Sequence, residues 1–597
     1  MSPVTRIPIP QISVLDAGGQ YCHLIARKVR DLGVYAEVRP SDTPAAELSG
    51  RKGLIISGGP SSVYEQGSPR IDPAILSPEF LTQGPAVLGI CYGLQLIAHQ
   101  LGGVVRPGQR GEYGLALLER PRPHVLFTGI DVESQVWMSH RDVVEAVPSG
   151  FEVLAATETC TVAAMAHRDR PVLAVQFHPE VVHTRYGTEI LSNFLFQICH
   201  CDRDWNPKDR IVPIEAKIRE VAGDRNIFFF VSGGVDSTVA YTLCLRALSP
   251  ERVYGIYVDT GLMREGETEF VQSLFHQLGA TAFHVEAAKK DFLSALQGVV
   301  DPERKRHIIG EQFVAVQERI LNSGRFLDGN WILGQGTIYP DTIESGGTAN
   351  ADLIKTHHNR VAGIQDLIDA GRIVEPLSSF YKDEVREIGR ELEIPDEFLN
   401  RHPFPGPGLA IRCLCSDVQA VVQPVADGWL APIRSVGVQG DSRSYRSVLI
   451  LEEQPSEAAF LRATRLANEI AEINRVIARI SAKLPLERLE VTRGFLSDTR
   501  LERLRLADSV VRRHCHEAGF DTQVWQFPVV LTPLGDAHAP DSVVLRPIHS
   551  VDGMTAQAVA MPEQLLGEIT AEILKIEGVC GVFYDLTNKP PATIEWE

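Results

Sequence analysis

Residues 227–248 constrain the fold of this chain more than any other stretch. Five apolar residues of high strand propensity, Ile227 to Val231, are followed by Ser-Gly-Gly-Val-Asp-Ser-Thr at 232–238. Apolar residues then recur at helical spacing from Val239 to Leu248. This order predicts a buried strand, a tight glycine turn and a helix. Adjacent glycines let backbone N–H groups approach an anion, and a helix N-terminus adds partial positive charge, so the turn is a candidate phosphate site.

The chemistry of this turn differs from that of the common phosphate loop. Ser232, Ser237 and Thr238 add hydroxyl donors and Asp236 is a candidate Mg²⁺ ligand, but the Gly-Lys-[Ser/Thr] ending of a Walker A loop is missing. A bare pair of glycines would favour a plain turn that closes an α/β unit. The full motif resembles the pyrophosphate-binding loop of the N-type ATP pyrophosphatases, which split ATP between its α and β phosphates and transfer AMP. That resemblance implies ATP contacts from the whole motif: Ser232, Gly233, Gly234, Val235, Asp236, Ser237 and Thr238.

Length and composition indicate a multidomain globular protein. At 597 residues the chain is long enough for about three or four domains, and its 44% hydrophobic and 22% charged residues are ordinary. A formal net charge of −18 argues against bulk binding to nucleic acid or to an anionic membrane. The sequence predicts neither a signal peptide nor a transmembrane span. Ten cysteines without a CxxC pair indicate reduced thiols and a cytoplasmic protein.

The N-terminal third carries a candidate cysteine nucleophile. Strands are expected at 11–17, 53–57 and 85–90 with helices between them, which predicts a parallel sheet covered on both faces. Cys91 follows the third strand within a Gly-Ile-Cys-Tyr-Gly motif, which has the Gly-x-nucleophile-x-Gly shape of a nucleophile elbow. A buried structural cysteine is the ordinary alternative. The flanking glycines favour the nucleophile, because they permit the tight turn that exposes a thiol.

A cysteine nucleophile needs a general base and a group that orients the base. His178 and Glu180 follow an expected strand at 172–177 and fit these roles, although a lone histidine near a strand end is more often a surface or core residue. Gly-x-Cys-x-Gly followed by Phe-His-Pro-Glu resembles the class I glutamine amidotransferases, over roughly residues 10–200. The resemblance implies release of ammonia from glutamine, with catalysis by Cys91, His178 and Glu180 and oxyanion stabilisation by the N–H groups of Gly59 and Tyr92.

A nucleotide-binding domain is expected after a charged linker near 201–210. A helix at 211–222, strands at 253–259 and 331–337, and the phosphate turn together predict a doubly wound domain. Because the turn has no lysine, the cations that neutralise pyrophosphate must come from elsewhere. The candidates are Lys355, in Lys-Thr-His-His-Asn, and Lys382, in Tyr-Lys-Asp-Glu-Val-Arg, although a lone lysine is usually a solvated side chain.

Further motifs extend the resemblance to nearly the whole chain. Ser-Gly-Gly-Val-Asp-Ser, Lys-Thr-His-His-Asn, Pro-Leu-Ser-Ser-Phe-Tyr-Lys-Asp-Glu-Val-Arg and His-Pro-Phe-Pro-Gly-Pro-Gly-Leu-Ala-Ile-Arg are similar to motifs of the glutamine-hydrolysing GMP synthetase family. By that resemblance Lys355 lies on a mobile lid and Lys382 contacts pyrophosphate. The basic run at 304–307, otherwise a solvated helix turn, supplies an arginine to the nucleotide. The implied contacts with xanthosine monophosphate (XMP) are Arg306, Asp441, Gln526, Lys589 and Glu595.

The expected fold class is α/β, with two doubly wound parallel-sheet domains followed by an α+β C-terminal domain that carries a helical insertion. The expected boundaries are 1–205 for the glutamine amidotransferase domain, 206–400 for the ATP pyrophosphatase domain and 401–597 for the C-terminal domain. The insertion, at about 452–525, is similar to that of the longer animal-type members of the family. A three-four spacing within it predicts a core-facing helix through Leu466, Ile470, Ile473, Ile477, Ile480 and Leu484.

The last residues, Thr587 to Glu597, match the family's ending, which closes over the nucleotide. Removing Ile594 to Glu597 is therefore expected to abolish synthesis with glutamine and with ammonia, while thermal melting stays near that of the parent. The alternative is that this segment completes the C-terminal core. In that case melting falls and the affinity for XMP does not.

The resemblance implies an enzyme that makes GMP from XMP. ATP adenylates the C2 oxygen of XMP, pyrophosphate leaves, and ammonia from glutamine displaces AMP. The implied co-substrate is ATP and the implied cofactor is Mg²⁺; a monomer or homodimer with small-molecule substrates, and without a nucleic-acid or membrane partner, is expected. Two alternatives stay open: a relative of NAD synthetase and a catalytically silent nucleotide-binding regulator. The His-Pro-Phe-Pro-Gly-Pro-Gly and Pro-Pro-Ala-Thr-Ile-Glu-Trp-Glu motifs argue against the first, and the intact catalytic positions against the second.

Overall fold

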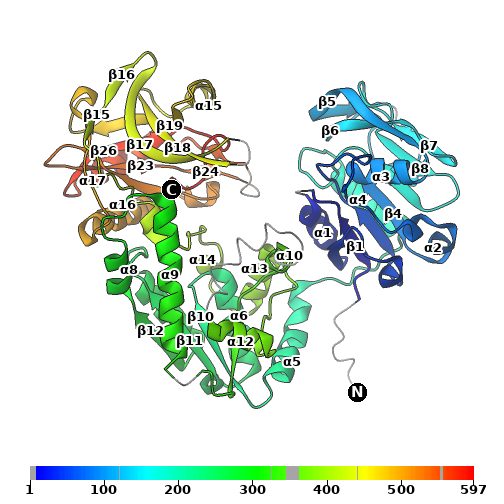
Figure 1. The fold of residues 1–597 in the computed structure, drawn as a ribbon, viewed down its shortest axis with the longest axis horizontal. Coiled ribbons are helices and arrows are strands. Elements are labelled where there is room, and N and C mark those ends of the chain that lie inside the picture. The colour runs from blue at the N-terminus through cyan, green and yellow to red at the C-terminus, as the bar shows by residue number, and fades with distance from the viewer. Residues whose placement is uncertain are drawn as a thin grey trace. The chain divides into compact units, whose positions relative to one another are not determined.

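The computed structural model describes residues 9–19, 21–119, 122–323, 326–344, 362–439, 442–550 and 555–597. The chain divides into two compact units, Met1–Pro213 and Ile214–Glu597 (Figure 1). Lys355 and Asp441, two of the predicted substrate contacts, lie outside the described residues. No helix in the described part of the chain is both long and apolar enough to cross a membrane.

The first unit is built on a seven-stranded sheet with the order β2-β1-β3-β4-β9-β8-β7. Neighbouring strands from β2 to β9 pair in parallel, and β8 and β7 extend the sheet through antiparallel pairs. A separate antiparallel ribbon is formed by β5 (Val104–Leu118) and β6 (Ser134–Ala146). The sheet strands are β1 (Ile12–Asp16), β2 (Ala36–Pro40), β3 (Gly53–Ile56), β4 (Ala86–Ile90), β7 (Phe151–Ala155), β8 (Ala164–His167) and β9 (Val172–Val175), and the α-helices described are α1 (Cys22–Asp31), α2 (Pro78–Gln83), α3 (Tyr92–Gln100) and α4 (Gly187–Ser192).

Continuous apolar runs account for the central strands of this sheet. Every residue of β3 and β4 is buried, as expected for parallel strands covered by helices on both faces. Helix α1 buries Ile25 and Val29, which lie one turn apart, against the sheet. The strands predicted at 11–17, 53–57 and 85–90 are confirmed as β1, β3 and β4.

The second unit opens with a five-stranded parallel sheet of the order β12-β11-β10-β13-β14. From the central strand β10 the chain moves to one side for β11 and β12 and to the other side for β13 and β14. The turn after β10 therefore lies at the switch point of a doubly wound sheet, where ligands bind. The strands are β10 (Asn226–Val231), β11 (Val253–Asp259), β12 (Ala282–Ala287), β13 (Trp331–Gly334) and β14 (Ile373–Val374).

Helices cover this parallel sheet, and three of them, α6, α9 and α13, carry predicted site residues. Helix α6 follows the phosphate turn. Helix α13 packs closely on α6: a Cβ on Gly389 of α13 would lie only 3.2 Å from a methyl carbon of Val239 of α6. The helix predicted at 211–222 is confirmed as α5. The helices described are α5 (Ile211–Ala222), α6 (Val235–Ala247), α7 (Glu267–Gln277), α8 (Lys289–Ala295), α9 (Pro302–Leu321), α10 (Tyr339–Glu344), α12 (Ala362–Asp369), α13 (Lys382–Glu391) and α14 (Asp396–Leu399).

The rest of the second unit is a mixed α+β structure around a sheet of the order β16-β17-β18-β19-β26-β23-β21. The same part of the chain also contains a smaller sheet, β15-β20-β22, and the strand pair β24-β25. The strands are β15 (Ala420–Val421), β16 (Gln423–Val425), β17 (Gly428–Gln439), β18 (Ser442–Leu451), β19 (Ile473–Ala482), β20 (Glu490–Val491), β21 (Val529–Thr532), β22 (Leu534–Gly535), β23 (Asp541–Leu545), β24 (Ile548–His549), β25 (Gln557–Ala558) and β26 (Val579–Asp585), and the helices are α15 (Glu457–Glu469), α16 (Asp498–Glu517) and α17 (Glu563–Ile573). One hydrophobic cluster joins Leu262 and Phe292 of the nucleotide-binding half to Leu531 and Tyr584 of this half.

The predicted core-facing helix from Leu466 to Leu484 is wrong. The helix α15 ends at Glu469, and Ile473–Ala482 form β19, which pairs with β18 and β26 inside the large sheet. The stretch is rich in β-branched residues, which fit a strand well, and a short apolar run does not distinguish the two structures by its spacing alone. Tertiary pairing with two neighbouring strands decides the outcome. Residues 452–525 thus hold two helices, α15 and α16, around a strand of the main sheet.

The burial of the last residues argues against the expectation that removing Ile594 to Glu597 leaves thermal melting near that of the parent. Trp596 is fully buried in a cluster with Val448 and Phe583, and its Nε1–H donates to Oδ2 of Asp585 at 2.9 Å. The backbone carbonyl of Thr593 accepts hydrogen bonds from two buried arginines of β19 and the β23–β24 connection. Removing Ile594 to Glu597 therefore has to lower the stability of this unit as well as remove any nucleotide contact.

Candidate functional sites

Cys91 stands at the turn between β4 and α3, where it is the N-cap residue of the helix. Its φ of 54° lies in the left-handed region, which is uncommon for a residue other than glycine. Close packing explains both glycines of the motif: a Cβ on Gly89 would lie 2.6 Å from the backbone of Gly93, and a Cβ on Gly93 would lie 2.4 Å from the carbonyl oxygen of Ile56. The strained turn thus places the thiol at the N-terminus of α3.

His178 and Glu180 follow β9 and form a buried pair. Nδ1 of His178 lies 2.7 Å from Oε1 of Glu180, and because an ionised carboxylate only accepts, Nδ1 carries a proton. Burial lowers the pKa of His178, but the Glu180 carboxylate and Cys91 raise it more, so this pKa lies well above its ordinary value. The structure therefore brings Cys91, His178 and Glu180 together, with the imidazole between the thiol and the carboxylate.

Gly58 and Gly59, in the loop after β3, line the same turn. A Cβ on Gly58 would lie 3.0 Å from Cε1 of His178 and 3.6 Å from Cβ of Cys91, so a side chain there would crowd the histidine. A Cβ on Gly59 would lie 2.4 Å from the carbonyl oxygen of Ala17. The N–H of Tyr92, the first residue of α3, has no acceptor within the helix. The predicted oxyanion donors are therefore close to the thiol along the chain: Gly59 follows Gly58, which lies against Cys91, and Tyr92 follows Cys91 itself.

Two further groups contact the thiol and were missed by reasoning from sequence. Nε2 of Gln176 and the carbonyl oxygen of Ser139, on β6, each lie 3.6 Å from Sγ of Cys91. Gln176 stands just after β9 and directly before the Phe-His-Pro-Glu motif, so its place in the sequence is a usable signal. Ser139 belongs to the β5–β6 ribbon, and no local pattern connects it to Cys91.

The phosphate turn after β10 is organised by its own side chains. Oγ of Ser232 accepts from the N–H of Gly234 at 3.2 Å and lies 3.0 Å from Oγ of Ser237. The hydroxyl of Thr238 donates to the carbonyl oxygen of Gly234 at 2.9 Å. Gly233 has a φ of 73°, which strongly favours glycine. These bonds hold the turn open at the N-terminus of α6, as a phosphate cradle requires.

Asp236, in the first turn of α6, faces Lys382 at the start of α13. Oδ2 of Asp236 lies 3.5 Å from Nζ of Lys382. Burial raises the pKa of Asp236, and Lys382 opposes this shift. Oδ1 of Asp236 is a buried oxygen without a hydrogen-bond partner in the described part of the chain. An unpartnered carboxylate oxygen beside a phosphate cradle fits Mg²⁺, which prefers oxygen ligands and binds through one or two carboxylates plus phosphate.

The residues predicted to contact XMP gather around the last residues of the chain. Nε2 of Gln526 donates to Oε1 of Glu595 at 3.2 Å. Nη2 of Arg306, in the first half of α9, donates to the backbone oxygen of Glu597. The structure thus brings Arg306, Gln526 and Glu595 into one neighbourhood. Lys589 lies earlier in the same segment, where its backbone pairs with that of Ala556.

Family models match three parts of this chain. Residues 13–198 match the class I glutamine amidotransferase model, residues 210–315 the NAD synthase model, and residues 513–596 the GMP synthase C-terminal domain model. A protein of Leptospira interrogans named probable glutamine-hydrolyzing GMP synthase is 40% identical over 98% of this chain and 99% of its own length. A protein of Caldicellulosiruptor saccharolyticus, named glutamine-hydrolyzing GMP synthase, gives the same three values.

The chain belongs to the glutamine-hydrolysing GMP synthase family. Its mixed α/β fold is consistent with this family. The part that matches the class I amidotransferase model precedes the part that resembles an ATP pyrophosphatase. A similarly named protein of Aquifex aeolicus is 38% identical over 98% of this chain and 99% of its own length. The NAD synthase model covers only residues 210–315, whereas the C-terminal match is specific to GMP synthases.

Arg412 pairs with Glu595, a contact that reasoning from the sequence missed. Its Nε and Nη2 donate to the two carboxylate oxygens of Glu595, at 3.0 Å and 2.7 Å. Burial raises the pKa of Glu595, but Arg412 lowers it more, so this pKa lies below its ordinary value. Arg412 is the last residue of the His-Pro-Phe-Pro-Gly-Pro-Gly-Leu-Ala-Ile-Arg motif. The motif is visible in the sequence, but no local pattern connects Arg412 to a residue so far along the chain.

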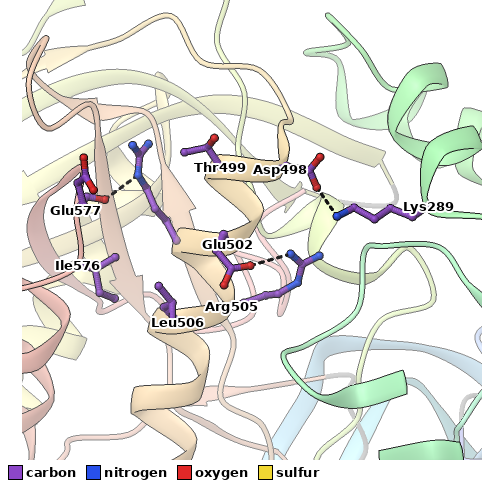
Figure 2. A pocket seen from close by; sticks show the side chains of 9 residues that line it. Lys289, Asp498, Thr499, Glu502, Arg505, Leu506, Ile576 and Glu577 are labelled. Carbon is purple, nitrogen blue, oxygen red and sulfur yellow. Dashed lines mark hydrogen bonds and ion pairs between the residues drawn. The ribbon is translucent and has the colours of Figure 1, made fainter. Parts of the chain in front are cut away.

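Two other features of the described residues, a cavity and a cluster of potential metal ligands, contain none of the predicted site residues. A cavity of about 520 Å³ lies along α16. Its lining includes the ion pairs Lys289–Asp498 (2.7 Å) and Arg505–Glu502 (3.3 Å), which are drawn as dashed lines in Figure 2. Its lining is Lys289, Asp498, Thr499, Glu502, Arg503, Arg505, Leu506, Ile576 and Glu577. Mixed and mutually paired charges of this kind favour no one ligand.

Glu112, His140 and Cys160 in the first unit offer ligand atoms within 4.8 Å of one another. Hydrogen bonds already engage two of these side chains. Nε2 of His140 lies 3.2 Å from Oε2 of Glu112, and Nδ1 of His140 lies 3.0 Å from the carbonyl oxygen of Asp142. The hydroxyl of Thr157 donates to Oε1 of Glu112 at 3.1 Å. Burial raises the pKa of the Cys160 thiol to about 12, which disfavours the thiolate that a metal needs. We assign no metal to this cluster.

Proposed function

We propose that this protein makes GMP from XMP, using ATP and the ammonia released from glutamine, with AMP, diphosphate and glutamate as the other products. The observation that carries the proposal is the full-length similarity to proteins named glutamine-hydrolyzing GMP synthase. The buried Cys91–His178–Glu180 set and the phosphate turn at 232–238 support it, because they supply the two half-reactions from two separate places.

The first half-reaction is hydrolysis of glutamine at Cys91. The thiolate attacks the side-chain amide carbon, and the N–H groups of Gly59 and Tyr92 stabilise the oxyanion. His178 donates a proton to the departing ammonia and then takes one from the water that hydrolyses the thioester. Glu180 holds the ring so that Nε2 serves these transfers. The support for these roles is the buried His178–Glu180 bond and the position of the thiol at a helix N-terminus.

The second half-reaction is adenylation of XMP in the second unit. The turn at 232–238 and the N-terminus of α6 bind the diphosphate end of ATP, and Lys382 adds a positive charge beside it. The C2 oxygen of XMP attacks the α-phosphorus and diphosphate leaves. Ammonia then attacks C2, and AMP departs with the former C2 oxygen. We assign the binding of XMP to Arg306, Asp441, Gln526, Lys589 and Glu595. Asp441, and Lys355 as a contact of ATP, lie in the part of the chain that is not described.

Mg²⁺ is the metal that we assign to this site, with Asp236 as its protein ligand. Bound there, the ion neutralises charge on the phosphates of ATP. The support is the buried, unpartnered Oδ1 of Asp236 next to the phosphate turn. Asp236 holds its carboxylate at the cradle, and Lys382 lies 3.5 Å from the other carboxylate oxygen.

Three domains follow from this assignment of the two half-reactions. We place them at 1–205, 206–400 and 401–597, with an insertion at about 452–525. The division of the chain after Pro213 and the three family matches support these limits. We further infer a cytoplasmic location, which the ten free cysteines support. A monomer or a homodimer is expected, and sedimentation of the purified chain distinguishes them.

An isotope experiment tests the proposed chemistry directly. XMP labelled with ¹⁸O at C2 is incubated with ATP, Mg²⁺ and glutamine, and the products are analysed by mass spectrometry. The proposal predicts that one ¹⁸O appears in the phosphate of AMP and none in diphosphate. Label in diphosphate, or GMP formed without labelled AMP, contradicts it. Amination of the NAD precursor in place of XMP would favour a relative of NAD synthetase.

A further inference from the structure

Lys305, on α9, is a buried cation that takes no part in the mechanism above. Its side chain is 0% exposed, and its Nζ donates to the carbonyl oxygens of Ala410 (3.3 Å) and Cys413 (3.0 Å) and to Oε2 of Glu597 (2.6 Å). A protonated lysine has three donors, so these three acceptors satisfy it completely. Lys305 therefore ties α9 both to the stretch at 408–413 and to Glu597. Figure 1 shows the last residue of the chain beside one end of α9.

The charge state of this pair follows from its geometry. Burial lowers the pKa of Lys305, but the Glu597 carboxylate raises it more, so the ammonium group is present at neutral pH. Burial also raises the pKa of the Glu597 carboxyl group. The 2.6 Å separation and the complete set of acceptors around Nζ favour the charged form of both partners.

Glu597 links Lys305 to a residue predicted to contact the nucleotide. The backbone oxygen of Glu597 accepts from Arg306, the residue after Lys305. Successive residues of a helix project about 100° apart, so α9 holds Glu597 from two directions. Nε of Arg306 remains a buried donor without a partner in the described residues. The position of Glu597 thus determines how Arg306 is oriented.

The same segment carries Glu595, two residues before Glu597. The Glu595 carboxylate is held by Arg412 and Gln526, and its carbonyl oxygen accepts from Nη2 of Arg475 at 2.6 Å. Only Trp596 separates Glu597 from Glu595, so the ion pair with Lys305 restrains the same short segment that carries Glu595. Glu597 thus contacts Arg306 directly and lies next to the anchored Glu595.

We propose that Lys305 is a positioning residue for the nucleotide substrate. Its ion pair with Glu597 fixes the segment 595–597, so that Arg306 and Glu595 meet XMP in their binding geometry. This inference rests on the proposed function. The competing explanation is a purely structural ion pair. Breaking a buried pair lowers stability in either case, so the Michaelis constants have to decide between them.

The test compares Lys305→Met with Lys289→Met, whose lysine is half-exposed and pairs with Asp498 along the cavity of Figure 2. GMP formation is measured with ammonia as the nitrogen donor, varying XMP and ATP separately. We expect Lys305→Met to raise the Michaelis constant for XMP by about tenfold or more, with that for ATP within about twofold. Lys289→Met should leave both constants within about twofold of the parent.

A second pair of variants decides the matter if Lys305→Met does not fold. Glu597→Gln keeps an acceptor for Lys305, and Glu597→Ala removes it. We expect the alanine variant to raise the Michaelis constant for XMP and the glutamine variant to stay within about threefold of the parent.

Unchanged XMP constants in folded Lys305→Met, a parallel rise in the ATP constant, or equal behaviour of the two Glu597 variants would overturn this inference alone. A parent protein that makes no GMP from XMP and ammonia would overturn the proposed function, and this inference with it.

Discussion

Replacing Glu180 with glutamine probes the candidate glutaminase site without removing Cys91 or His178. Oε1 of Glu180 lies 2.7 Å from Nδ1 of His178, and Oε2 is buried with no hydrogen-bond partner among the described residues. An amide has two orientations in this place. If its oxygen faces His178, the NH₂ group becomes an unsatisfied buried donor. If its NH₂ group faces His178, the ring proton moves to Nε2, which can then no longer accept a proton from Cys91.

Either orientation costs about 1.5–3 kcal/mol, the range for losing a hydrogen bond to a charged group or for leaving a buried group unpaired. That free energy corresponds to roughly a 10- to 150-fold change in rate. We therefore expect Glu180→Gln to slow glutamine hydrolysis by roughly 10- to 150-fold, while GMP formation from ammonia stays within about twofold of the parent.

The assay measures glutamate release and ammonia-dependent GMP formation on the same preparations. Glu112→Gln is the matched control, because Glu112 also pairs with a buried histidine, at 3.2 Å, in the same unit. Its glutaminase rate should stay within about threefold of the parent. A folded Glu180→Gln variant with a parent-like glutaminase rate would refute the role given to the His178–Glu180 pair.

Four other predictions concern the two candidate sites and the C-terminal core. Cys91→Ala should abolish GMP formation from glutamine but not from ammonium salts, and loss of both activities in a folded variant would contradict separable sites. Asp236→Ala should abolish diphosphate release from ATP while Cys91 still reacts with a glutamine analogue; normal release would rule out the metal-holding role. Trp596→Ala should destabilise the second unit by about 3–5 kcal/mol, seen as a lower melting temperature, because the side chain is fully buried; unchanged melting would contradict this. The raised pKa of His178 means that its contribution to stability is complete below about pH 6.5 and is lost as pH rises through the folded-state pKa. The melting temperature of the parent should therefore fall as pH rises above about 6.5. The melting temperature of Glu180→Gln should depend less on pH.

Local patterns predicted the strands and turns that carry the candidate chemistry. A strand, a glycine turn and a helix are consecutive in sequence, so the positions of Cys91 and of the phosphate turn could be read directly. The pairing of His178 with Glu180 is local too, because only one residue separates them. These elements depend little on the rest of the chain.

The features that could not be predicted from the sequence depend on contacts between residues far apart in the chain. Arg412 meets Glu595, and Lys305 meets Glu597, only because the last residues return to the start of α9 and to the 408–413 stretch. The strand β19 was predicted as a helix because its apolar spacing fits both structures, and only its pairing with β18 and β26 decides between them. Trp596 could not be placed in the core from its position near the end of the sequence, since terminal residues are commonly frayed.

The central claim is that one chain couples glutamine hydrolysis to amination of XMP. The most direct test incubates the purified full-length protein with XMP, ATP, Mg²⁺ and glutamine, and follows the loss of XMP absorbance together with the products. We expect GMP, AMP, diphosphate and glutamate in equal amounts, with ammonia able to replace glutamine. Absence of GMP with both nitrogen donors, in a folded protein that binds ATP, would contradict the claim.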